Sequence, residues 1–409
     1  MLRFSVTIPA YNEERGIADI LGRTLKACAS LRSEVPGVDG YEVVVVDDGS
    51  RDSTASIVGT FPGVTLIEHP TNRGYGAALK TGFAAAQGDY IGFLDADGTY
   101  PPECFPELLR TAIRTGADMV IGSRMAGMQS EMPLLRRVGN TAFALLLSWV
   151  ANTRVSDTAS GMRILKKESL ARLRPLPDGL ELTPAMSTLA LHEGLTVVEV
   201  PIPYAERAGR SKLNALRDGV RFASTIVGLA EIYNPLKFFG VAGIFMLGLA
   251  LLLGIGPVVH YLRYRAVPLS EIYRLLTILV LVVTGLNVLL FGIAANHVIA
   301  LVRGSAGIDH WLARLVHVGR LKRLGLFGLV LMGAAILLNG QAIYNYLTTF
   351  RVGVHWSYAL TGVFLFLTGS HLFMISRLVR VFELLREQVR MDPASGHSAR
   401  AAKDQDPRR

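Results

Sequence analysis

The chain has 409 residues, of which 50% are apolar and only 18% are charged. This length allows more than one domain, and the apolar share is high for a purely soluble protein. The net charge is +9, but Lys and Arg gather beside apolar segments, which favours anionic lipids over nucleic acid as partners. The two cysteines, Cys28 and Cys104, have no CxxC spacing and give no sign of a disulfide framework or a structural zinc site.

The first 125 residues alternate short apolar or β-branched runs with amphipathic helical stretches. Strands are expected at 4–9, 41–47, 64–68, 90–95 and 119–123, and helices at 14–31 and 75–87. This alternation is typical of a mostly parallel sheet with helices on both faces, which binds ligands beyond the carboxyl ends of its strands. The chain opens directly on a strand pattern, so we expect no secretory signal.

Residues 130–235 are less regular. The pattern predicts an apolar helix at 134–150, a strand at 196–201 and a helix at 214–233. Because the last helix leads into the apolar second half, its apolar face can lie in a membrane interface or pack on its own domain. Both readings remain open.

The second half contains four stretches without Asp, Glu, Lys or Arg, at 238–262, 275–302, 324–350 and 352–376. Each exceeds the ~20 residues that a helix needs to cross a bilayer core. We expect spans at 238–260, 276–300, 325–348 and 356–376. The expected domains are therefore 1–213, an interfacial helix region at 214–235, a transmembrane domain at 236–380 and a disordered tail at 391–409.

Loop charges predict the orientation of these spans. Basic residues gather in 303–323 and after 376, which puts both chain ends on the inner side, although three arginines in 263–274 weaken the contrast. We expect a multi-pass protein of the cell (inner or plasma) membrane whose N-terminal domain is cytoplasmic.

The strongest chemical signal is Asp95-Ala96-Asp97, directly after an apolar strand. Two carboxylates with this spacing can face one hard cation that also bridges to substrate phosphates. Taken alone the motif is weak, because surface turns often contain it.

Carboxylates also follow two other strands of the predicted sheet. The first strand ends in Pro9-Ala10-Tyr11-Asn12-Glu13-Glu14, and the second ends in Asp47-Asp48-Gly49-Ser50. Gathering such charges is costly unless they hold a cation or hydrogen-bond donors, and the base and ribose of a nucleotide offer donors to Glu13 and Asp47. Alternatively, Asp47 or Asp48 and Ser50 cap the following helix.

Together these segments resemble the family 2 glycosyltransferases, and among them the dolichyl-phosphate mannosyltransferase-like enzymes. The matching pieces come in the family order and span about residues 4–233. They are residues 9–14, 46–50, Asn72-Arg73-Gly74-Tyr75-Gly76-Ala77-Ala78, 95–97, Gly122-Ser123-Arg124 and Arg207-Ala208-Gly209-Arg210-Ser211-Lys212.

The resemblance implies a GT-A fold and a role for each matching segment. It implies that Pro9, Ala10, Tyr11, Glu13, Asp47, Asp48 and Gly49 surround the nucleotide and that Asp95 and Asp97 bind Mg²⁺ or Mn²⁺. It implies that Arg124, Arg136 or Arg137, Arg207, Ser211 and Lys212 gather around phosphates, with Arg163 near the sugar and acceptor. The chain departs from the family pattern at Thr99, where some relatives carry a metal-binding Gln.

The basic residues before the 214–233 helix are suited to binding a phosphate. Arginine suits bidentate phosphate contacts, and Arg207, Arg210 and Lys212 lie where a lipid phosphate would arrive. The alternative is a basic patch that attracts the membrane surface without a specific ligand.

The sequence thus predicts an enzyme that moves a hexose from a nucleotide-sugar donor (GDP-mannose or UDP-glucose type) to a polyisoprenyl phosphate by inverting, metal-assisted displacement. The alternatives are another lipid acceptor, such as diacylglycerol, or a transferase fused to a lipid-sugar translocating domain. A processive polysaccharide synthase is disfavoured, because the chain lacks a Gln-x-x-Arg-Trp motif. The sugar, the base, the lipid length and the formation of a homo-oligomer are left open.

Overall fold

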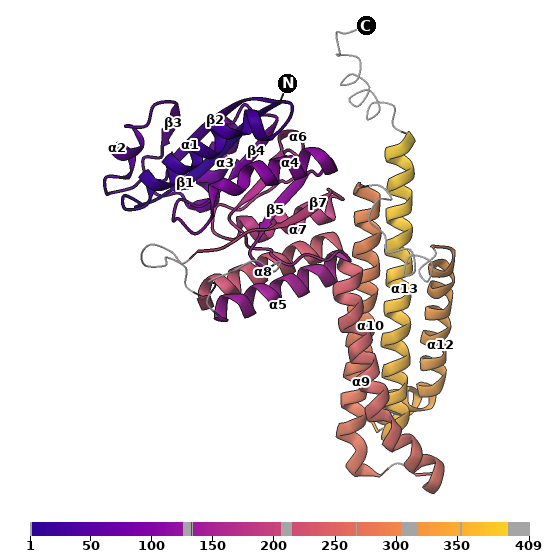
Figure 1. The fold of residues 1–409 in the computed structure, drawn as a ribbon. Coiled ribbons are helices and arrows are strands. Elements are labelled where there is room, and N and C mark those ends of the chain that lie inside the picture. The colour runs from indigo at the N-terminus through magenta and orange to yellow at the C-terminus, as the bar shows by residue number, and fades with distance from the viewer. Residues whose placement is uncertain are drawn as a thin grey trace. The chain divides into compact units, whose positions relative to one another are not determined.

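The computed structural model describes residues 2–125, 132, 134–205, 215–266, 268–303, 318–351 and 354–391. The chain divides into two compact units, Met1–Ala230 and Glu231–Arg409. Figure 1 labels most of their helices and strands. The finer domain limits expected from the sequence remain predictions.

The described part of the first unit contains a seven-stranded sheet with the order β3-β2-β1-β4-β6-β5-β7. Its strands are β1 (Leu2–Ala10), β2 (Val38–Asp47), β3 (Val64–Glu68), β4 (Tyr90–Phe93), β5 (Met119–Ser123), β6 (Arg163–Lys166) and β7 (Val197–Pro201). All paired neighbours run parallel except β6, which is antiparallel to β4 and β5. The mostly parallel sheet predicted from the sequence is confirmed.

The strand β6 was not predicted from the sequence. It is four residues long, with Arg163 at its start and Lys166 at its end. A run this short shows no period-two alternation of apolar side chains, so no pattern marked it as a strand.

Helices cover both faces of the sheet. Phe4, Val6 and Ile8 of β1 belong to the main core with apolar residues of α1 (Ile17–Glu34) and α4 (Phe105–Thr115). On the other face, Val44 and Val46 of β2 pack with Ala78 of α3 (Tyr75–Ala85). The other described elements of this part of the chain are α2 (Thr54–Val58), η1 (Pro102–Cys104), α5 (Leu134–Ala151), α6 (Lys167–Leu170), α7 (Leu182–His192) and α8 (Ala215–Tyr233).

A close contact sets α3 against the central strand. A Cβ atom at Gly82 of α3 would lie 2.1 Å from Cγ2 of Thr7 in β1. Glycine is therefore required here, because a larger residue would push the helix off the sheet.

The strand order reverses at β1. The chain runs from β1 to β2 and β3 on one side and then crosses to β4 on the other side. Sheets of this kind bind ligands in the crevice beyond the carboxyl ends of the strands at the reversal. In this chain those ends carry Pro9-Ala10-Tyr11 and the Asp95 loop.

The described part of the second unit contains four long helices, with a short turn η2 (Leu269–Glu271) before the second. The helices are α9 (Pro235–Tyr264), α10 (Ile272–Arg303), α12 (Val318–Thr349) and α13 (Trp356–Met391). In the described residues, four segments are long and apolar enough to cross a bilayer, at 235–264, 272–296, 323–349 and 356–382. They agree with the four spans expected from the sequence.

Small residues bring these helices close together in pairs. A Cβ atom at Gly243 of α9 would lie 2.7 Å from the backbone oxygen of Gly285 in α10. Gly328 of α12 and Gly369 of α13 approach each other in the same way, at 2.5 Å. Such small-residue contacts are typical of helices that pack within a membrane. The tail after Met391 lies outside the described residues.

Candidate active site

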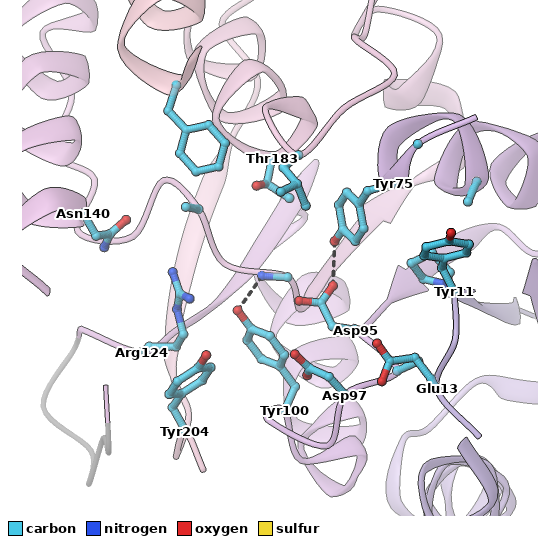
Figure 2. Close-up of a pocket in the computed structure, with 18 of the residues that line it drawn as sticks. Tyr11, Glu13, Tyr75, Asp95, Asp97, Tyr100, Arg124, Asn140, Thr183 and Tyr204 are labelled. Carbon is cyan, nitrogen blue, oxygen red and sulfur yellow. Dashed lines mark hydrogen bonds between the residues drawn. The ribbon is translucent and has the colours of Figure 1, made fainter. Parts of the chain in front are cut away.

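A cavity of about 820 Å³ lies at the carboxyl ends of β1 and β4 (Figure 2). This part of the cavity is lined by residues from six segments, namely Pro9, Ala10, Tyr11, Glu13, Asp48, Asn72, Tyr75, Asp95, Asp97, Tyr100, Arg124 and Tyr204. In Figure 2, Asp95, Asp97 and Glu13 lie on one side of Tyr100, and Arg124 with Tyr204 lies on the other. All three strand ends that the sequence singled out therefore contribute residues to one cavity.

Asp95 is held between a hydroxyl group and a glycine. The Tyr75 hydroxyl donates a hydrogen bond to Oδ1 of Asp95 at 2.7 Å, and a Cβ atom at Gly161 would lie 2.2 Å from Oδ2. Burial raises the pKa of Tyr75, and the nearby Asp95 charge raises it further. Tyr75 therefore stays protonated and acts as a donor to this carboxylate.

Asp97 is positioned by the residue that departs from the family pattern. The Thr99 hydroxyl donates to Oδ1 of Asp97 at 2.6 Å, and the Thr99 backbone amide donates to the same oxygen at 3.2 Å. Thr99 is buried and does not line the cavity. Its role in this structure is to orient Asp97.

The donor set fits a hard divalent cation. Asp95 and Asp97 both line the cavity and offer carboxylate oxygens, which Mg²⁺ and Mn²⁺ prefer. Within the described residues, no group of three or more His, Cys, Asp or Glu side chains is arranged to hold a metal. A cation at this pair would therefore complete its coordination with substrate phosphates and water, which is usual for Mg²⁺.

Arg124 is paired with a buried carboxylate. Its Nε and Nη2 donate to the two oxygens of Asp157 at 2.8 and 2.7 Å, and its backbone amide donates to Asp157 at 3.0 Å. Burial alone would raise the pKa of Asp157, but the Arg124 charge and hydrogen bonds outweigh it and hold that pKa below its usual value. Arg124 is therefore a fixed cation whose charge is partly neutralised.

Two aromatic rings lie near Arg124, and a second carboxylate supports the loop of its partner Asp157. The guanidinium lies 5.9 Å from the ring centre of Tyr100 and 5.3 Å from that of Tyr204. Glu199 of β7 accepts hydrogen bonds from the backbone amides of Ser156 and Asp157 at 2.8 and 2.9 Å. Glu199 thereby fixes the loop that presents Asp157 to Arg124.

A second cavity of about 570 Å³ adjoins the first at Tyr11 and Asn72, which line both. Asp47 and Gly49 line this second cavity, as do Glu68 and His69 after β3. Gly49 has a φ of +73°, and a Cβ atom there would lie 2.7 Å from the backbone of Thr71. The predicted nucleotide residues thus divide between two neighbouring cavities.

The side chain of Asp47 closes a turn rather than capping α2. Asp47 accepts hydrogen bonds from the amide and hydroxyl of Ser50, so it closes its own turn. The start of α2 is held instead by Asp52, which accepts from the Thr54 amide at 3.0 Å. The capping alternative for Asp47 is therefore not what the structure shows.

The remaining predicted residues do not line the cavity or lie outside the described part of the chain. Arg163 is fully buried; its guanidinium donates to the carbonyls of Thr158 and Ser160 and to the Ser187 hydroxyl, and it does not line the cavity. Burial lowers its pKa to about 10. Arg137 is exposed on α5. The side chain of Arg136 and the whole of Arg207, Arg210, Ser211 and Lys212 lie outside the described residues.

The far end of the first cavity is apolar. It is lined by Met132, Val138, Gly139 and Phe143 at α5 and by Gly219 and Phe222 of α8. The Phe143 and Phe222 rings meet edge to face with centres 6.0 Å apart. The contact between α5 and α8 was not predicted from the sequence, because residues almost 80 positions apart show no local signal of contact.

Comparison with known proteins identifies the family. Residues 5–174 match the family described as Glycosyl transferase family 2, and residues 235–391 match a Domain of unknown function (DUF8752). A dolichyl-phosphate hexose transferase from Haloferax volcanii is 34% identical over 54% of this chain and 92% of its own length. An undecaprenyl-phosphate 4-deoxy-4-formamido-L-arabinose transferase from Pseudomonas fluorescens is 30% identical over 64% of this chain and 74% of its own length.

Two further likenesses are weaker. A dolichol-phosphate mannosyltransferase from Pyrococcus furiosus is 32% identical over 58% of this chain and 65% of its own length. Among solved structures, glucosyl-3-phosphoglycerate synthase from Mycobacterium tuberculosis, in complex with Mn²⁺, uridine diphosphate and phosphoglyceric acid, covers 56% of this chain and 78% of its own. The two chains are 23% identical, with a TM-score of 0.43. The chain belongs to glycosyl transferase family 2, and within that family it is similar to the transferases named for dolichyl and undecaprenyl phosphates.

Proposed function

We propose that this glycosyltransferase moves a hexose from a nucleotide sugar, of the GDP-mannose or UDP-glucose type, to a polyisoprenyl phosphate. One observation carries the proposal: a single cavity joins a carboxylate pair at one end to an apolar end between α5 and α8, with Arg124 also in its wall. A donor diphosphate needs the first feature, and a lipid phosphate needs the other two. The names of the relatives support the same reaction class.

The donor side of the site is built by the ends of β1, β2 and β4. Tyr11, which lines both cavities, would lie between the base and the sugar, with Asp47 in the adjoining cavity as an acceptor for donors of the base. A divalent cation held by Asp95 and Asp97 would offset the charge that builds on the departing diphosphate.

The reaction we propose is a single displacement. An oxygen of the lipid phosphate forms a bond to the anomeric carbon while the bond from that carbon to the nucleoside diphosphate breaks, so the configuration inverts. A phosphate dianion is already a nucleophile, and no general base is needed. The protein contributes position and electrostatic stabilisation, which can supply several kcal/mol each.

The acceptor side combines a cation with an apolar wall. Arg124 keeps Nη1 outside its pair with Asp157, and this amino group can donate to a phosphate. Phe143, Phe222 and Val138 would contact the first isoprene units of the lipid chain. Arg207, Ser211 and Lys212 extend this proposal from the sequence alone.

We further propose that the catalytic domain is cytoplasmic, on the evidence of the basic loops of the second half. The four candidate spans serve as an anchor in this proposal. Flipping of the lipid product by residues 234–390 alone in proteoliposomes would instead favour a translocating domain.

The decisive experiment is an assay of membranes that contain the full chain, with Mn²⁺, a polyprenyl phosphate and a panel of nucleotide sugars, read by mass. We expect a polyprenyl-phosphate hexose that is absent with the Asp97→Ala variant. A parallel arm with diacylglycerol tests the other acceptor class. A product in that arm alone would overturn the proposed acceptor.

A further inference from the structure

His69 lies directly after β3 and is buried, with 6% of its surface exposed. Its Nδ1 lies 2.7 Å from Oδ1 of Asp48, and its Nε2 lies 2.9 Å from the Thr81 hydroxyl on α3. Its backbone amide donates to the Asp47 carbonyl at 2.8 Å. Both ring nitrogens are thus engaged, and the imidazole forms part of the wall of the second cavity.

Asp48 gathers three donors around a buried carboxylate. It is 2% exposed and accepts from the His69 ring, from the Arg73 amide at 2.9 Å and from the Gly74 amide at 2.8 Å. A buried carboxylate is stable only when donors replace the lost water. Loss of the imidazole would leave Asp48 undersatisfied and free the two amides to move.

The Arg73 and Gly74 amides lead directly into α3, whose first residue contacts Asp95. Gly74 has a φ of +106°, and a Cβ atom there would lie 2.5 Å from the Asp178 carbonyl oxygen, so this turn is tightly set. The next residue, Tyr75, is the first of α3, and its hydroxyl donates to Asp95 at 2.7 Å. A continuous series of contacts therefore runs from His69 through Asp48 and Gly74 to Tyr75 and Asp95.

We propose that His69 is a positioning residue that sets the place of the Asp95 carboxylate, and thereby metal and donor binding, through Asp48 and Tyr75. The inference rests on the proposed function, because it assigns Asp95 to the cation. In this proposal the second cavity does more than bind the donor, because His69 in its wall sets the geometry of the carboxylate pair in the first cavity. A histidine that only fills space would share the burial but not the effect on Asp95.

Two conservative variants separate the two hydrogen bonds of the ring. The side-chain amide of His69→Asn can reach the position of Nδ1 and still donate to Asp48, whereas that of His69→Gln extends toward the position of Nε2 and Thr81. Thr81→Val removes the second bond and leaves Asp48 untouched. The proposal therefore expects His69→Asn and Thr81→Val to resemble the natural protein and His69→Ala and His69→Gln to be impaired.

The measurement uses the full chain in nanodiscs. Mn²⁺ binding is followed by the electron paramagnetic resonance signal of the free ion, with UDP or GDP as the nucleotide, and thermal unfolding is recorded for every variant. We expect His69→Ala to weaken Mn²⁺ binding and lower kcat by about 10-fold each, which corresponds to the loss of about one hydrogen bond's net contribution. Changes within about 3-fold are expected for His69→Asn and Thr81→Val.

The combination with Tyr75→Phe is the sharpest test. If His69 acts through Tyr75, then His69→Ala costs little more in Mn²⁺ affinity once Tyr75→Phe is present, because contacts in one network are not additive. Additive losses, or unchanged Mn²⁺ binding in His69→Ala, would overturn the inference. Failure of the natural protein itself to bind Mn²⁺ with either nucleotide would overturn the proposed function, and this inference with it.

Discussion

Tyr75 and Asp95 lie 20 positions apart in the sequence, and a hydrogen bond of 2.7 Å joins them at the wall of the cavity. Tyr75 is the first residue of α3, and Asp95 follows β4. The contact therefore ties the start of a helix to the carboxylate pair. Burial and the nearby Asp95 charge raise the pKa of Tyr75, so the hydroxyl stays protonated and remains a donor.

The Tyr75→Phe variant should lower transfer while the protein stays folded. The change removes one hydroxyl that donates to a carboxylate and leaves the ring in place, so we expect a loss of about 10-fold in kcat. The Mn²⁺ concentration at half-maximal rate should rise, because Asp95 loses its orientation. Steady-state rates against Mn²⁺ concentration measure both, and an unchanged metal dependence would contradict the assigned role.

The Asp95→Ala and Asp97→Ala variants should abolish transfer with the fold intact, with losses on the order of 10² to 10³-fold or more. Thr99→Val is the matched comparison, because it keeps both carboxylates and removes only the 2.6 Å bond from Thr99 to Asp97. That variant should lose about 3- to 10-fold. Full activity in either alanine variant would exclude a metal role for that residue.

The sequence predicted the parts of this site that depend on strand ends. Asp47 and Asp95 each stand at the end of an apolar run, and parallel strands bring such ends to one edge of the sheet. The sequence did not predict contacts that depend on β6, which lies antiparallel between β4 and β5. Its insertion places Gly161 beside Asp95, and no local pattern encodes that neighbour.

Contacts between polar residues far apart in the sequence were missed for the same reason. Arg124 was expected at a phosphate, but its partner Asp157 is 33 residues away and the supporting Glu199 lies 42 residues beyond that. Each of these residues alone reads as an ordinary polar side chain. Only burial on folding makes the pair costly to break, and burial at this point is a property of the fold.

The Asp157→Asn variant should destabilise the first unit by about 3 kcal/mol, since it leaves the Arg124 guanidinium buried without its countercharge. The pKa of Asp157 lies below its usual value in the folded protein. Its contribution is therefore fully present above pH about 4 and is lost as the pH falls through the lowered pKa. Thermal unfolding between pH 7 and pH 3 should show a constant deficit that shrinks only at the acid end.

Asp178→Asn provides the control for that measurement. Asp178 pairs with Lys80, but its side chain is 66% exposed, and such surface pairs contribute about 0 to 1 kcal/mol. A deficit as large as that of Asp157→Asn would show that the loss of any carboxylate, rather than of the buried pair, destabilises the unit.

Gly219→Leu should block the lipid end of the cavity without disturbing the donor end. Gly219 lies on α8 and lines the cavity, and a Cβ atom there meets nothing within 4 Å. The leucine side chain would therefore occupy space that the proposal assigns to the first isoprene units. We expect KM for the polyprenyl phosphate to rise about 10-fold, the equivalent of about 1.4 kcal/mol of lost apolar contact, while nucleotide-sugar affinity is unchanged.

Gly228→Leu is the matched control, because Gly228 lies on the same helix, also has open space around its Cα, and does not line the cavity. Both changes raise the helix propensity of α8 by about the same amount, near 1 kcal/mol. A difference between them therefore reports on the cavity and not on the helix. If the two variants raise KM for the lipid equally, the apolar end between α5 and α8 does not bind the acceptor, and a site for the lipid chain must be sought elsewhere on the protein.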